Sequence, residues 1–187
     1  MRKYMFVIGV VMGVSLAVAG GNVEAKEKPF HANFAGIETN KDDLSFTGTS
    51  GAGYATVAGK STLGEYTAQM VGDFEPDGNT CTPPDGSSGV ELAGVAEVFV
   101  LSFTATGEQL FLTLSPVGQV GCCSDTGIVC TAQITFAING GTGRFAGATG
   151  TIVKTVKSIG LAPLDPSGRG GFSSFTGTFD GTIELAK

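Results

Sequence analysis

One carboxylate of the chain alternates with large apolar side chains in the pattern of a β-strand. Within residues 95–104, Glu97 shares one face with four hydrophobic residues, which are Val95, Phe99, Leu101 and Phe103. If that face points into an apolar interior, desolvation raises the pKa of the Glu97 carboxyl group towards the range useful for general acid–base catalysis. Lys154 alternates with Ile152 and Val156 and is the candidate partner of Glu97. The favoured interpretation is nevertheless that Glu97 lies at a strand end in water and that Lys154 is exposed on the surface.

Aromatic and aliphatic residues of the same kind of face are candidate ligand contacts. The side chains predicted to line a binding site are Glu97, Phe99, Leu101, Phe103, Phe136 and Tyr66. Such a lining favours a small apolar or aromatic molecule as the partner. Glu97 and Lys154 are the catalytic candidates if the site also performs a reaction.

The cysteines predict disulfides rather than a metal site. There are four of them, Cys81, Cys122, Cys123 and Cys130. Because a bond between adjacent cysteines strains the backbone, we expect Cys81 to pair with Cys122 or Cys123, and Cys130 to pair with the other. The bonds would join the predicted loops 75–90 and 116–130 and contribute roughly 2–4 kcal/mol.

No motif predicts a metal or a cofactor. Residues 73–78 imitate the start of a calcium-binding loop, but Pro84 occupies the position where the last carboxylate is expected, so a solvated acidic turn is favoured. His31 is the only histidine and has no evident partner. A hydrolase triad and a histidine-rich zinc site are therefore not expected.

Short strands must position these residues. Glycine makes up 30 of the 187 residues, and no apolar repeat with a period of 3.6 residues is sustained. Alternation is clearest in 95–104, 131–138 and 174–185, and further strands fit near 31–37, 44–49, 54–58, 63–74, 109–115 and 151–158. Gly107 is expected to take a positive φ in the hairpin that follows 95–104.

These strands predict an all-β fold, a single antiparallel closed barrel of about eight strands. Closure removes exposed sheet edges and creates an interior that either is filled by side chains or holds one small ligand. Two polar segments, 75–90 and 159–172, are expected to be loops at the mouth of the barrel.

The first 25 residues are typical of a signal peptide. Arg2 and Lys3 precede an apolar run, which ends in a small-x-small pattern at residues 23–25. We expect residues 26–187 to form one secreted or periplasmic domain without a membrane anchor. Removing residues 1–25 leaves nine basic and sixteen acidic residues, a net charge of −7, which argues against nucleic-acid partners.

Three segments resemble the barrel of allene oxide cyclase and dirigent-type proteins, in a bacterial secreted form. They are residues 58–67, 107–111 and 140–150, the last with five glycines in a turn. The resemblance extends over about residues 44–185. It implies an eight-stranded antiparallel barrel, often trimeric, with an apolar cavity that in some relatives steers cyclisation or radical coupling. It assigns no site residues, because the cavity groups of those relatives have no matching motif in this sequence.

Three functions remain open from the sequence. The leading hypothesis is an exported, disulfide-stabilised barrel that binds a small apolar or aromatic molecule in its cavity. The first alternative is a cyclase or isomerase of the allene oxide cyclase or dirigent type, in which Glu97 assists the reaction. The second is a non-catalytic structural or adhesive module with a filled interior.

Overall fold

Eight long strands make up almost all of the described chain. The computed structural model describes residues 26–40, 51–124, 129–163 and 171–186. Its strands are β1 (Lys26–Asn40), β2 (Gly51–Ser61), β3 (Gly64–Cys81), β4 (Gly89–Phe103), β5 (Gln109–Ser124), β6 (Val129–Gly141), β7 (Thr149–Pro163) and β8 (Gly171–Leu185). One 3-10 helix, η1 (Gly143–Phe145), joins β6 to β7, and the described residues include no α-helix.

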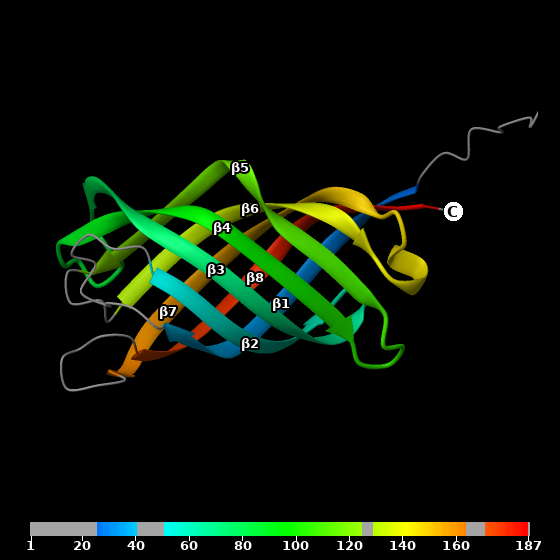
Figure 1. Ribbon diagram of the computed structural model, residues 1–187, viewed down its shortest axis with the longest axis horizontal. Helices are drawn as coiled ribbons and strands as arrows, with labels where there is room; N and C mark the ends of the chain where they lie inside the picture. The colour runs from blue at the N-terminus through cyan, green and yellow to red at the C-terminus, as the bar shows by residue number, and fades with distance from the viewer. Residues whose placement is uncertain (1–25, 41–50, 125–128, 164–170, 187) are drawn as a thin grey trace, which may run out of the picture.

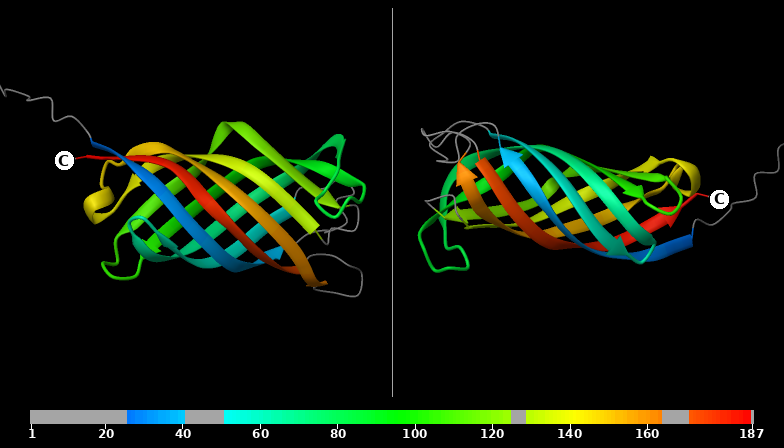
Figure 2. Two further views of the ribbon diagram at one scale, coloured as in Figure 1. Left: turned by 180° about the vertical axis from the view of Figure 1, so that it is seen from behind. Right: turned by 90° about the horizontal axis from the view of Figure 1, so that it is seen from below.

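The strands close into an antiparallel barrel in chain order. Each pairs with the next, and β1 also pairs with β8, from Lys26 opposite Leu185 to Asn40 opposite Gly171. The strands run obliquely around the long axis (Figures 1 and 2), as closure of a twisted sheet requires. The predicted all-β, antiparallel ring of about eight strands is therefore confirmed.

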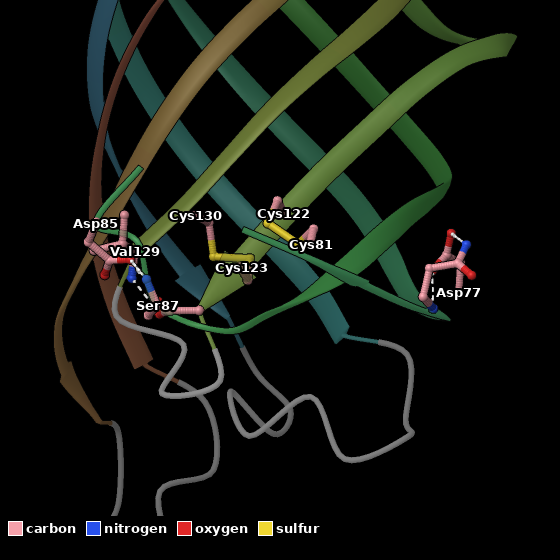
Figure 3. Close-up of a disulfide and its surroundings, with 10 residues drawn as sticks. Asp77, Cys81, Asp85, Ser87, Cys122, Cys123, Val129 and Cys130 are labelled. Atoms are coloured by element: carbon pink, nitrogen blue, oxygen red, sulfur yellow. Dashed lines mark hydrogen bonds between the residues drawn. A yellow bond between two sulfur atoms is a disulfide. The ribbon is translucent and has the colours of Figure 1, made fainter. Parts of the chain in front are cut away.

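The two ends of the barrel differ in how they are built. At one, which we call the η1 end, short turns join β2 to β3 and β4 to β5, and η1 joins β6 to β7 (Figure 1, right). Gly107, in the turn between β4 and β5, has a φ of 71°, as predicted. The four cysteines lie at the opposite end, which we call the disulfide end (Figure 3).

The strand predicted near 44–49 and the signal peptide predicted at 1–25 lie outside the described residues. The loop predicted at 75–90 is shorter than expected, because β3 continues to Cys81 and β4 begins at Gly89. The pairing of β3 with β4 shifts register twice in this region, after Asp73 and after Pro76. At a β-bulge the pairing of two strands shifts by a residue or more and then continues. The strands therefore extend into a segment whose composition is typical of a loop, and the predicted strand ends were wrong.

The other predicted loops shorten in the same way. β7 extends to Pro163 and β8 begins at Gly171, so the described parts of 159–172 belong to strands. In 116–130, β5 reaches Ser124 and β6 begins at Val129. Ladder hydrogen bonds to a neighbouring strand satisfy the backbone along these polar stretches, which composition alone does not reveal.

The η1 end is closed by aromatic packing. Phe145 of η1 is fully buried and stacks on Phe103, with ring centroids 4.8 Å apart. The Arg144 guanidinium lies 4.7 Å from the Phe145 ring centroid and donates a 2.9 Å hydrogen bond to the carbonyl of Leu63. Glu108 holds Arg144 by accepting from its backbone N–H at 2.8 Å. This turn therefore acts as a plug.

A layer of phenylalanine rings fills the middle of the barrel. Phe99 makes edge-to-face contacts with Phe136 and Phe179, with centroids 5.5 and 5.4 Å apart. Phe179 contacts Phe34, which contacts Phe175. We call these five residues the aromatic layer. A Cβ atom at residue 177 would lie 2.6 Å from the Phe34 ring, so the glycine there makes room for the layer.

Candidate functional site

Polar side chains replace apolar ones on the inward faces beyond the aromatic layer. Going towards the disulfide end, Glu97 follows Phe99 on β4, and Ser173 is the inward residue after Phe175 on β8. Lys154 comes from β7 and follows buried Ile152. The interior therefore changes from apolar to ionisable within a few residues, and this change defines the candidate site.

Glu97 and Lys154 form an ion pair across the barrel interior. The Lys154 Nζ atom contacts Oε1 of Glu97, and the two residues are 4% and 1% exposed. Their strands, β4 and β7, are not neighbours in the ring, so the pair spans the interior. The inward orientation and the partnership with Lys154, which the sequence left as the less favoured interpretation, are therefore what the structure shows. The favoured interpretation, with Glu97 in water and Lys154 on the surface, is wrong, because Glu97 lies well inside β4 and not at its end.

The surroundings of the pair hold it in place. Lys154 Nζ lies 4.9 Å from the Phe99 centroid and 5.5 Å from that of Phe136, so two rings of the aromatic layer face the ammonium group. Gly72 is opposite Glu97 on β3, where a Cβ atom would lie only 3.2 Å from Cγ of Glu97. The glycine leaves room for the Glu97 side chain.

Two polar atoms of this part of the interior are buried without a partner. Among the described residues, Glu97 Oε2 and Ser173 Oγ accept and donate no hydrogen bond, and Ser173 is 6% exposed. A third such atom, Oδ1 of Asp73, lies at a register shift between β3 and β4. A buried polar group without a partner costs about 1–3 kcal/mol, so it calls for a functional explanation.

Glu38 completes the cluster and was not predicted. It is half-buried on β1, directly opposite Ser173 of β8, and is close enough to Glu97 and Lys154 for their charges to shift its pKa. The two-residue alternation of β1 could have identified Glu38, because it continues the inward face of Phe30, Ala32 and Phe34. The strand predicted at 31–37 ended one residue too early. We call Glu38, Glu97, Lys154 and Ser173 the interior polar cluster.

Burial dominates the electrostatics of both carboxyl groups. Desolvation raises the pKa of Glu38 to about 7, with the Lys154 charge opposing the rise and the Glu97 charge adding to it. Desolvation also raises the pKa of Glu97, against the effect of its ion pair and hydrogen bond with Lys154. Glu38 is therefore a carboxyl group that exchanges its proton near neutral pH.

The predicted ligand contacts divide between two regions of the barrel. Phe99 and Phe136 are beside the polar cluster, as described. Phe103 and Tyr66 belong to the η1 end, where Tyr66 donates a 3.0 Å hydrogen bond to the carbonyl of Asn33 and its burial raises the pKa of its hydroxyl. Leu101 is fully buried between Phe99 and Phe103 along β4. Ligand binding by these residues stays a prediction.

The disulfides pair in one of the two predicted ways. Cys81 of β3 bonds to Cys122 of β5, and Cys123 of β5 bonds to Cys130 of β6 (Figure 3). Adjacent side chains of a strand point to opposite faces, so Cys122 and Cys123 reach different partners. The bonds link the disulfide-end segments of three strands, β3, β5 and β6.

The remaining sequence motifs are on the outer surface. His31 contacts Oδ1 of Asp180, its paired residue on β8, so the single histidine does have a partner. Asp77 accepts a 2.8 Å hydrogen bond from the backbone N–H of Asn79, and the acidic segment belongs to the irregular end of β3 rather than to the separate turn that was predicted. In the described ranges, no three His, Cys, Asp or Glu side chains gather closely enough to hold a metal ion.

Comparisons with protein-family models, curated proteins and solved structures found no match for the chain. Within the part of the chain that is described, no helix is long and apolar enough to span a membrane.

Proposed function

We propose that the protein binds a small organic molecule inside the barrel, at the interior polar cluster. The observation that supports this most strongly is the presence of two unpartnered buried atoms, Oε2 of the ion-paired Glu97 and Oγ of Ser173, which is opposite Glu38. Such atoms are costly in a packed core and useful where a ligand completes their hydrogen bonds.

The aromatic layer supplies the apolar part of the proposed site. Phe99 and Phe136 lie against Lys154, and Phe175 is the next inward residue to Ser173 on β8. Rings on one side and polar atoms on the other favour a ligand with an aromatic or apolar body and one polar group. The sequence already favoured a small apolar or aromatic ligand, and the polar cluster adds one polar group to that description.

The two disulfides indicate an oxidising, extracellular environment. In this proposal residues 1–25 are a signal peptide, and residues 26–187 are one exported domain of the allene oxide cyclase and dirigent type. A homotrimer, which the resemblance implies, belongs to the same proposal.

A second candidate function, a cyclase or isomerase, is favoured by Glu38. A carboxyl group with a pKa of about 7, next to a buried ion pair, can accept and return a proton at neutral pH. Glu97 would then assist Glu38, and Lys154 would stabilise negative charge that develops on the bound molecule. If Glu97→Gln leaves a turnover of this protein unchanged, that residue has no catalytic role.

Dye binding tests the proposed site. N-phenyl-1-naphthylamine, an apolar aromatic probe that fluoresces in dry surroundings, should bind saturably to the oxidised protein. Ser173→Phe should abolish the signal by filling the site. The matched control is Ser174→Phe, whose side chain lies on the other face of β8 and should leave binding intact.

Two further measurements keep the test decisive. Thermal unfolding shows whether each variant is folded. If Ser173→Phe does not fold, the smaller replacement Ser173→Val takes its place and should lower the affinity for the dye. Native mass spectrometry of the protein purified from an oxidising compartment should show extra mass that is released on denaturation. No saturable dye signal and no bound mass would overturn the proposal and favour the structural module.

A further inference from the structure

We propose that the ligand of the interior polar cluster is an organic monocation, a protonated amine carried on an aromatic or apolar body. This inference rests on the proposed function and adds the charge of the ligand to it. It follows from which atoms of the cluster are already partnered and from what the others can accept.

The charges of the cluster do not balance by themselves. Lys154 and Glu97 are in contact and compensate one another, while Glu38 forms no ion pair with another described residue. Glu38 is therefore the uncompensated charge when it is ionised, and one positive charge on the ligand would neutralise it. A ligand anion would instead face two carboxylates, with the only cation of the cluster already bound to Glu97.

The hydrogen-bonding capacity points the same way. Glu97 Oε2 and an ionised Glu38 can only accept hydrogen bonds, and Ser173 Oγ can accept as well as donate. An ammonium group has three donors and no acceptor. It is thus matched to three acceptors that come from β1, β4 and β8, two of them buried without a partner.

The aromatic layer suits the same class of ligand. Phe175 is next to Ser173 on the inward face of β8, and Phe34 contacts Phe175 with centroids 5.8 Å apart. Ring faces attract organic cations and also pack against an aromatic body. The cluster already holds one ammonium group in this manner, because Lys154 Nζ lies over Phe99 and Phe136.

Three probes of nearly equal size and different charge test the inference. They are 2-phenylethylamine, 2-phenylethanol and 3-phenylpropanoate, each measured at pH 8 by displacement of N-phenyl-1-naphthylamine and by calorimetry. The amine should bind about tenfold more tightly than the alcohol, because a hydrogen bond to an ionised group is stronger than a neutral one. The carboxylate should bind more weakly than either.

Glu38→Gln should reduce the ratio of amine to alcohol affinity to near one. The matched control is Glu27→Gln, which removes an exposed carboxylate from the same strand and should keep the ratio at about tenfold. Glu97→Gln is a second variant, which should lower the ratio as well.

The outcomes separate the two proposals. If the dye binds but the alcohol or the carboxylate equals or exceeds the amine, the inference about charge is overturned and the binding site stands. If neither the dye nor any of the three probes binds, the proposed function itself is overturned. If the ratio of amine to alcohol affinity stays at about tenfold in Glu38→Gln, the role given to Glu38 is overturned.

Discussion

Glu38→Gln is expected to stabilise the protein above pH 7 and to have little effect below pH 4.5. Burial raises the pKa of Glu38 from 4.5 to about 7, so the folded protein keeps a proton that the unfolded chain loses in between. The contribution of Glu38 to stability is complete below pH 4.5 and is lost as the pH rises through 7. Glutamine has no charge to bury, and the variant therefore avoids this loss.

The size of the effect follows from the shift in pKa. A rise of about 2.5 units corresponds to about 3 kcal/mol, at roughly 1.36 kcal/mol for each unit. This value already contains the attraction of Lys154 and the repulsion of Glu97, the two charged groups that act on Glu38. Because Glu38 is half-buried and keeps some contact with water, about 3 kcal/mol is the upper end of the expected gain.

Urea unfolding with the disulfides intact measures this prediction. The free energy of unfolding of each protein is compared at pH 4.5, 5.5, 6.5, 7.5 and 8.5, and only the difference between variant and parent is used, since other carboxylates titrate in both. The difference should grow over this window and level off. Glu27→Gln, which removes an exposed carboxylate from β1, should give no such curve. A difference for Glu38→Gln that is independent of pH would refute the assignment of a raised pKa.

Replacing Cys81 and Cys122 together by serine should cost about 4 kcal/mol, whereas replacing Cys123 and Cys130 should cost about 2 kcal/mol, because the bonds close separations of 41 and 7 residues. Denaturant unfolding under non-reducing conditions measures both, and equal losses would contradict the chain-entropy argument. Phe145→Ala should destabilise by about 3–5 kcal/mol, because it empties the fully buried plug at the η1 end. A loss below 1 kcal/mol in a thermal or urea melt would show that the turn does not support the barrel.

Alternation along single strands predicted the inward apolar faces well, and Phe99, Leu101 and Phe103 are the clearest case. Burial of every second residue from Glu97 to Phe103 needs only local geometry and one apolar face. The same reasoning stopped short at Glu38, where polar residues follow and the composition resembles a loop. Pairing of β1 with β8 as far as Asn40 keeps that segment extended, and pairing is not a property of one strand.

By itself, the sequence determined the class of fold, the inward faces and the small set of cysteine pairings that adjacent cysteines allow. These depend on side-chain type and on the two-residue period of a strand, which are both local. Only the tertiary structure decided that Cys81 bonds to Cys122 and that Lys154 reaches Glu97, which is 57 residues away in the chain. Those contacts depend on strand order, register and closure, because two side chains meet across a barrel only when every intervening pair of strands is in place.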